Sequence, residues 1–124
     1  MPAQQSAIDL AIAAAEAAAS KLATDIVILD VSEQLVITDC FVLCSGANEL
    51  QVKSIVDAIE EALHKLGEKR IRREGHQENT WVLLDYGDIV IHVQKAEERI
   101  HYAIERLWKD CPVIPLPESI NLNR

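Results

Sequence analysis

Residues 81–93 read WVLLDYGDIVIHV, and this stretch predicts a β-hairpin. Its two arms, 81–84 and 89–93, are short apolar runs rich in Val and Ile, which favour strands. Residues 85–88 make a tight turn between the arms, in which Gly87 can adopt the positive φ that such turns demand. The fold is therefore expected to contain a sheet, around which the remaining elements pack.

Three further strands are expected before the hairpin. The segments DIVILDV (25–31) and CFVLC (40–44) are nearly continuous apolar runs, which is typical of strands covered on both faces. Residues 70–75 favour a short exposed strand. The sequence thus predicts a mixed sheet of about five strands.

Helical periodicity covers three segments, residues 6–23, 49–66 and 96–111. With the strands, they predict a single α/β (α+β) domain at residues 1–112, in which helices flank the mixed sheet. Prolines then stop the last helix, because they cannot continue it. Residues 113–124 are expected to form an extended, mobile, Pro-rich tail.

The faces that these helices turn toward the core follow from the same period. The first helix is rich in alanine and has only a thin apolar stripe, so we expect it to dock weakly. Its expected inward residues are Ile8, Ile12, Ala15, Ala19 and Leu22. Those of the last helix are Ile100, Ala103, Ile104 and Leu107.

The chain is acidic: its 124 residues carry 20 Asp and Glu against 12 Lys and Arg, a net charge of −8. Nucleic acids and anionic membranes attract positive surfaces, so this balance disfavours DNA, membranes and direct contact with bare RNA. Residues 64–73 depart from it, since five bases and one acid give +4 there and leave −12 elsewhere. A solvated loop and an edge strand guarded by charge explain this run better than a phosphate site.

The N-terminal residues and the cysteines predict a cytoplasmic protein with reduced thiols. The first twenty residues contain no Lys or Arg, so the positive region of a signal peptide is missing. The alanine-rich run at 11–19 is too short to span a bilayer. Cys40 and Cys44 are four residues apart on one expected strand, about 13 Å, which is too far for a disulfide.

Two groups of side chains could carry chemistry. Asp85 and Asp88 flank a turn and could hold cations for phosphoryl transfer. Asp is also common in turns because it hydrogen-bonds its own backbone, and nothing nearby supplies a third ligand. Cys44, His92 and Asp30 could form a nucleophile, a base and an orienting acid. A buried thiol and a structural histidine in mid-strand explain these residues better.

The turn at residues 45–48, before the second helix, could hold an anion on its backbone amides. It lacks the glycine spacing and the lysine of a phosphate-binding loop. The four histidines are scattered along the chain, and no cysteine pair has the spacing of a zinc site. We therefore expect neither a metal nor a cofactor.

The aromatic residues fall into two groups. Trp81 and Tyr86 stand at the two ends of the first hairpin strand, and Tyr102 and Trp108 lie on the last helix. Large amphipathic side chains anchor protein interfaces. Core packing is the better interpretation of Trp108, whereas Trp81 and Tyr86 could serve in either role.

Three segments of the sequence resemble the signatures of the ribosomal silencing factor family RsfS, also called Iojap. The first signature is DCFVLCSG at 39–46, with Gln51 in the following helix. The second is Glu74-Gly75 followed by the hairpin at 81–93. The closing helix matches in Arg99, Tyr102, Glu105, Leu107 and Trp108. The resemblance covers roughly residues 8–112 and leaves out the tail.

This resemblance implies a ribosome-binding protein that is not an enzyme. The family binds the large ribosomal subunit through its ribosomal protein number fourteen, blocks joining with the small subunit and represses translation when nutrients are scarce. Its members form homodimers. Carried over by position, the hairpin supplies the contact, with Trp81 as apolar anchor and Leu84, Asp85, Tyr86 and Asp88 around it.

The family fold resembles the nucleotidyltransferases, in which a Gly-Ser turn is followed within about a dozen residues by an Asp-x-Asp or Asp-x-Glu pair that holds magnesium. Here Ser45 precedes Gly46, the first candidate acid follows Gly46 by 39 residues, and the acids are spaced Asp-x-x-Asp. The catalytic pattern is absent. Two alternatives stay open: an enzyme of nucleotidyltransferase or phosphoesterase type with a residual site near Ser45, Asp85 and Asp88, and a plain dimerisation module.

Overall fold

The sheet of this protein has six strands in the order β3-β4-β5-β2-β1-β6. The computed structural model describes residues 2–75 and 79–122, and at residues 102, 121 and 122 it describes the backbone alone. The strands are Thr24–Asp30 (β1), Cys40–Gly46 (β2), Arg72–Glu74 (β3), Trp81–Asp85 (β4), Ile89–Lys95 (β5) and Val113–Ile114 (β6). β2 and β5 are parallel and the other neighbours antiparallel. The predicted mixed α+β fold is confirmed.

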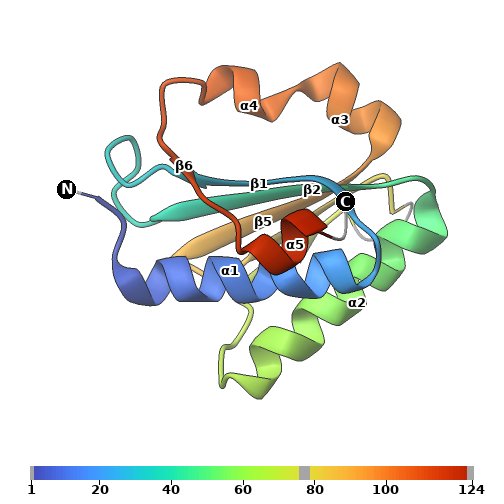
Figure 1. Ribbon diagram of the computed structural model, residues 1–124, viewed down its shortest axis with the longest axis horizontal. Coiled ribbons are helices and arrows are strands. Elements are labelled where there is room, and N and C mark those ends of the chain that lie inside the picture. The colour runs from blue at the N-terminus through green and yellow to red at the C-terminus, as the bar shows by residue number, and fades with distance from the viewer. Residues whose placement is uncertain (1, 76–78, 123–124) are drawn as a thin grey trace.

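Helices cover both faces of the sheet. They are Gln5–Ser20 (α1), Glu49–Lys65 (α2), Ala96–Tyr102 (α3), Ile104–Leu107 (α4) and Glu118–Leu122 (α5). In Figure 1, α1, α2 and α5 lie over one face and α3 and α4 over the other. The central strand β2 is buried along its whole length, which explains the continuous apolar run predicted for a strand covered on both faces.

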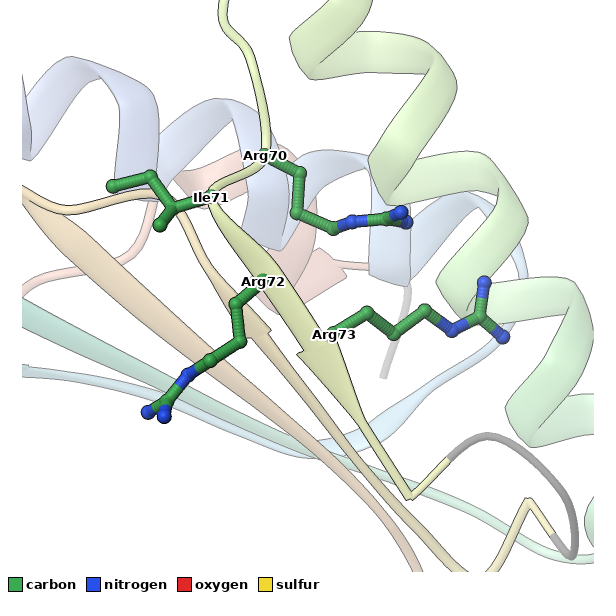
Figure 2. A pocket seen from close by; sticks show the side chains of 4 residues that line it. All are labelled: Arg70, Ile71, Arg72 and Arg73. Carbon is green, nitrogen blue, oxygen red and sulfur yellow. The ribbon is translucent and has the colours of Figure 1, made fainter.

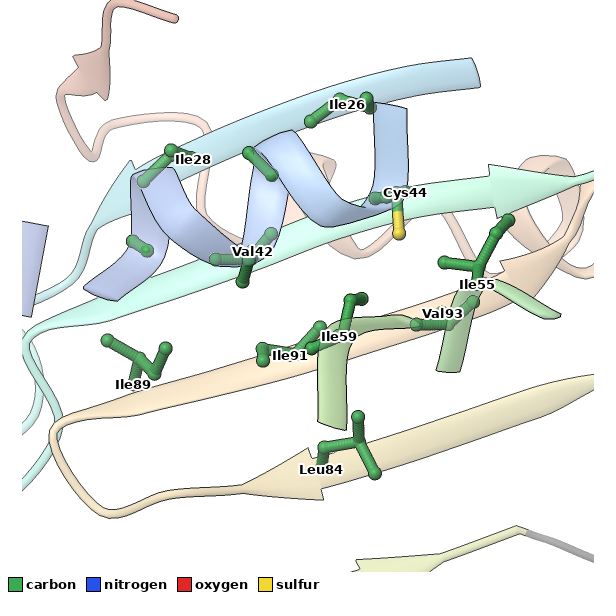
Figure 3. Packing of buried hydrophobic residues seen from close by; sticks show 14 of the residues in the cluster. Ile26, Ile28, Val42, Cys44, Ile55, Ile59, Leu84, Ile89, Ile91 and Val93 are labelled. Carbon is green, nitrogen blue, oxygen red and sulfur yellow. The ribbon is translucent and has the colours of Figure 1, made fainter. Parts of the chain in front are cut away.

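The main core lies between the sheet and the α1–α2 layer. Figure 3 shows side chains from alternate positions of the strands meeting those of α2 there. Its labelled members are Ile26, Ile28, Val42, Cys44, Ile55, Ile59, Leu84, Ile89, Ile91 and Val93, and all are buried. This cluster removes most of the large aliphatic side chains from water and is the principal source of the hydrophobic stabilisation.

A second, smaller core lies on the opposite face, beneath α3 and α4. Its buried members are Leu29, Val31, Phe41, Leu43, Ile104 and Cys111. The cover is incomplete over β4, where Trp81, Leu83 and Asp85 stay half-buried. One part of this face is therefore left open to solvent at the hairpin.

The first helix is packed more closely than its thin stripe suggested. Its fully buried residues are Ala7, Ala11, Ala14, Ala15 and Ala18. The expected Ile8, Ile12 and Ala19 are only half-buried, and Leu22 lies beyond the helix and is exposed. Of the expected face, Ala15 alone is fully buried. The correction has a simple cause: alanine lets the helix approach α2 and the sheet closely, so the smallest side chains face inward.

The last predicted helix is two short helices. Ala103 joins α3 to α4 with a φ of 24°, a value that no continuous helix contains. The break changes the phase, so Ile104 points inward while Ile100 and Leu107 are exposed, contrary to the prediction. It also lets Glu105 of α4 reach back to Arg99 of α3.

Residues 113–122, the part of the expected mobile tail that the structure describes, pack against the domain. Leu29 and Val113 pair across β1 and β6, and the carbonyl of Pro112 accepts a hydrogen bond from the Asp30 amide at 2.8 Å. Ile120 of α5 is buried in the main core. Proline is tolerated in an edge strand, because such a strand forms backbone hydrogen bonds with the sheet on one side only.

Candidate functional site

Three side chains of β4 form the open part of the sheet. Trp81, Leu83 and Asp85 are half-buried and share one face, whereas Val82 and Leu84 alternate with them and are fully buried on the other. We call Trp81, Leu83 and Asp85 the β4 strip. Leu83 was not among the predicted contact residues, although the strand period of two would have placed it beside Trp81.

The predicted contact residues divide between the two faces of the hairpin. Trp81 and Asp85 belong to the β4 strip, and Asp88 is exposed in the turn. Leu84 has no exposed surface, and Tyr86 keeps 8% of its own. Both pack in the main core. The structure therefore brings Trp81, Asp85 and Asp88 to the surface and holds Leu84 and Tyr86 beneath them.

Trp81 is held by a histidine of the neighbouring strand. Its indole Nε1–H donates to Nδ1 of His92 at 3.2 Å, and the two ring centroids are 6.1 Å apart. His92 in turn meets Phe41 edge-on, with ring centroids 5.3 Å apart. The predicted structural role of His92 is confirmed, because its ring nitrogen is used to fix the indole.

Acid is expected to destabilise the fold through His92. Burial, and secondarily the charge of Arg99, lower the pKa of His92 from 6.5 to about 4. Between these values the unfolded chain binds a proton that the folded chain excludes. The contribution of His92 to the free energy of unfolding is therefore fully present above pH 6.5 and is lost as the pH falls toward 4. The shift corresponds to a loss of about 3 kcal/mol.

Urea unfolding at pH 7.0, 5.5 and 4.5 measures this loss. His92→Gln removes the titrating group and should flatten the dependence between pH 4.5 and 6.5. A variant with the same slope as the original protein would show that other groups carry the acid sensitivity.

Asp85 stabilises the hairpin turn. Its Oδ1 accepts a hydrogen bond from the Gly87 amide at 2.8 Å, and its Oδ2 lies 3.6 Å from Nε of Arg72. Gly87 has the predicted positive φ, 85°. These contacts support the interpretation of Asp85 as a turn residue. Over residues 2–75 and 79–122, no three His, Cys, Asp or Glu side chains gather where they could hold a metal ion.

Ser45 contacts the buried guanidinium of Arg99 at the end of the sheet opposite the hairpin turn. Its Oγ accepts a hydrogen bond from Nη1 of Arg99 at 3.0 Å, and Arg99 also donates to Glu105 from Nε at 2.8 Å. Arg99 is 6% exposed. A buried guanidinium is tolerated when it is paired and hydrogen-bonded, as here.

The residues of the enzyme alternative lie apart. Ser45 is paired with Gln94 of β5, whereas Asp85 is paired with Val90 of the same strand. Four residues of strand separate Gln94 from Val90, which is about 13 Å. The structure therefore does not bring Ser45 together with Asp85, or with Asp88 in the turn beyond it.

Cys44, His92 and Asp30 do not form a catalytic group either. Cys44 packs in the main core, and burial raises the pKa of its thiol to about 12. His92 contacts Phe41 and Trp81 on the opposite face of the sheet. The Asp30 carboxylate accepts a hydrogen bond from the Ala3 amide at 3.0 Å. All three cysteines are buried free thiols.

The turn before α2 is built from its own side chains. Oδ1 of Asn48 accepts a hydrogen bond from the Gln51 amide at 2.9 Å and caps α2, and Oε1 of Gln51 accepts one from the Ala47 amide at 2.6 Å. The Gln51 side-chain amide also donates to the carbonyls of Lys21 and Leu22, each at 3.1 Å. Gln51, singled out in the first signature, thus ties this turn to the end of α1.

The three arginines of the basic run pair with neighbouring acids. Figure 2 shows Arg70 and Arg73 directed toward α2 and Arg72 on the opposite side of β3. Arg70 and Arg73 both pair with Glu60 of α2, and Arg72 pairs with Glu74 and Asp85. β3 is an edge strand. The predicted charge-guarded edge strand is confirmed. His76, just beyond this strand, lies outside the described residues, as does the Tyr102 side chain.

Comparison with known proteins agrees with the predicted family. The family model "Ribosomal silencing factor during starvation" matches residues 4–124. This chain belongs to that family. The match includes residues 113–124, which the resemblance had left out. In the part of the chain that the structure describes, no helix is long and apolar enough to cross a membrane.

Relatives and solved structures match along most of their length. Ribosomal silencing factor RsfS from Bacillus subtilis (strain 168) is 36% identical over 118 residues, 95% of this chain and 98% of that protein. The RsfS of Halalkalibacterium halodurans is 34% identical over 117 residues, 94% of this chain and 97% of its own. A crystal structure of a Chromobacterium violaceum protein superposes with a TM-score of 0.77 at 33% identity, over 85% of both chains. The predicted fold and family are therefore confirmed together.

Proposed function

We propose that this chain silences ribosomes by binding the large subunit and keeping the small subunit away. The observation that carries the proposal is the family match over residues 4–124, made with proteins named ribosomal silencing factors. The partner that we propose on the subunit is its ribosomal protein number fourteen. A protein with this function would act in the cytoplasm.

The β4 strip and the adjoining turn are the proposed contact surface. Trp81 would enter a pocket of the partner, since half-exposed tryptophans are frequent anchors of interfaces. Asp85 and Asp88 would steer the domain to a basic protein and away from bare RNA, because charge complementarity raises the association rate. Leu84 and Tyr86 would support this surface from the core side.

Steric exclusion needs no chemistry at the site. A specific interface of standard size buries about 800 Å² on each partner, which the β4 strip, its turn and the surface around them would have to supply. The rest of the domain then occupies the space that the small subunit requires. The proposed function therefore includes no catalytic residue and no cofactor.

A subunit-joining assay tests the proposal. Purified large and small subunits are mixed with increasing amounts of the protein, and the fraction of joined ribosomes is measured by sedimentation through a sucrose gradient. We expect the protein to co-sediment with the large subunit and the joined fraction to fall as the large subunit becomes saturated. Equal joining at saturation would contradict the proposal, and added salt should weaken the effect.

A further inference from the structure

The loop between β1 and β2 presents two adjacent apolar side chains to solvent. Val36 is 100% exposed and Ile37 is 81% exposed. Single exposed aliphatic residues are common on protein surfaces. Two in succession at the tip of one loop form an apolar spot, and in Figure 1 this loop extends beyond the end of the sheet. We call Val36 and Ile37 the loop tip.

The base of this loop is fixed by hydrogen bonds, so the loop tip is held in place. The Val31 amide donates to the Asp39 carbonyl at 2.9 Å and closes the loop. The Leu35 amide donates to the Val31 carbonyl at 2.9 Å, and the Leu35 side chain packs against the second core. A surface that is already ordered loses little conformational entropy when it binds.

Two further hydrogen bonds join the loop to the hairpin turn of the proposed contact surface. The Thr38 hydroxyl donates to the Gly87 carbonyl at 3.1 Å, and the Asp39 amide donates to the Asp88 carbonyl at 2.8 Å. Leu35 belongs to the cluster that also includes Trp81. The loop and the turn therefore lie together at one end of the sheet, and the β4 strip begins at this end with Asp85 and runs along β4 to Trp81.

The charge around this end is negative. The sequence has no Lys or Arg between residues 22 and 52, where it has five acids, and none between residues 74 and 94. Arg72 reaches the turn from β3 but is paired with Asp85 and Glu74. Lys109 and Asp110, which precede the Pro112 contact with β1, add no net charge. An apolar spot in such surroundings complements a basic protein that carries an apolar patch.

We propose that the loop tip is a second contact for the basic ribosomal protein, separate from the β4 strip; this inference rests on the proposed function. Bare RNA does not fit the site, because the acids around it repel phosphates. A second copy of this chain fits poorly as well, because it would bring the same acidic surroundings with it.

The test replaces both residues, as Val36→Ser with Ile37→Ser, and measures affinity for purified large subunits by co-sedimentation. We expect the double variant to bind about 10- to 100-fold more weakly, the range for loss of an apolar contact at an interface. Its thermal unfolding should be unchanged, because the replaced side chains are exposed. Leu50→Ser is the matched control, since Leu50 is an exposed aliphatic residue at the start of α2, and it should bind as the original protein does.

The possible outcomes separate the two proposals. If the original protein does not bind the large subunit, the proposed function fails. If it binds and the double variant binds equally well, the loop tip is not a contact and the proposed function stands. If light scattering shows that the double variant loses self-association while its affinity for the subunit is unchanged, the loop tip serves a homodimer and the inference is overturned.

Discussion

Replacing Trp81 with alanine is expected to weaken binding to the large subunit by about 30- to 1,000-fold, the range for a central aromatic anchor of about 2–4 kcal/mol. The indole is half-buried on the β4 strip and is fixed by its hydrogen bond to His92. An anchor held in one orientation before binding loses little entropy on docking. The measurement is co-sedimentation with large subunits, followed by the subunit-joining assay.

The domain should stay folded in this variant. The main core lies on the other face of the sheet and does not include Trp81. The change removes part of the second core and the hydrogen bond that His92 accepts, which together should lower stability by about 1–3 kcal/mol. Circular dichroism and thermal unfolding would confirm a native fold at the temperature of the binding assay.

Two further substitutions identify what Trp81 contributes. Trp81→Phe keeps an aromatic ring but removes the N–H donor, so it should retain more affinity than the alanine variant. Trp108→Ala is the matched control, because Trp108 packs edge-on against Phe41 at 5.1 Å between ring centroids. It should lower stability and leave affinity unchanged. Equal binding by Trp81→Ala and the original protein would remove Trp81 from the contact surface.

The hairpin and the central strand could be predicted from the sequence because local signals decide them. Gly87 adopts the positive φ that the turn needs, and the uninterrupted apolar run of β2 corresponds to burial on both faces. Asn48 caps α2 as its side chain predicts. In each case the residue that indicates the local structure also makes the contact that stabilises it. Tertiary packing therefore does not change the conformation that the sequence predicts.

The break in the last helix could not be predicted in the same way, because it accompanies a contact between residues that are distant in the sequence. The break at Ala103 follows from no local helix breaker, since alanine favours helices. It accompanies the burial of Arg99 against Ser45, a residue 54 positions away in the chain. The periodicity of the sequence contains no information about such a pair. Part of the inward face predicted for residues 96–111 was therefore wrong.

The terminal segment and the first helix show how tertiary packing overrides composition. The prolines at residues 112–117 indicated an extended segment, and β6 is extended. What they could not indicate was the free edge of β1, which accepts this segment as a sixth strand. Likewise, the alanines of α1 gave a weak apolar stripe, whereas in the fold their small size permits close contact with α2.

The candidate site could be located from the hairpin but not fully resolved. Sequence patterns placed Trp81 and the acidic turn in one element, and the structure leaves them at the surface. Leu84 came from the resemblance to the family, while the alternation of a strand favours Leu83 as the neighbour of Trp81 on the same face. The two leucines therefore offer a direct test of which face meets the partner.

Leu84→Ala is expected to reduce the free energy of unfolding by about 2–5 kcal/mol, because it leaves a cavity in the main core where Leu84 has no exposed surface. For a domain of this size the melting temperature should fall by roughly 8–20 °C. Affinity for the large subunit, measured well below the melting temperature, should change little. Thermal unfolding followed by circular dichroism provides the stability measurement.

Leu83→Ala is the matched variant, since it removes the same atoms from the adjacent, half-buried position of the β4 strip. It should reduce stability by about 1 kcal/mol, because Leu83 is only half-buried and part of its surface already meets water. Its affinity should fall about tenfold if the strip is the contact surface. If instead Leu84→Ala loses affinity and Leu83→Ala does not, the β4 strip is not the contact surface. The hairpin would then have to rearrange on binding to expose Leu84. The pair of measurements thus tests the orientation of β4 and the proposed contact surface at once, because the two leucines are adjacent in the sequence and lie on opposite faces of the strand.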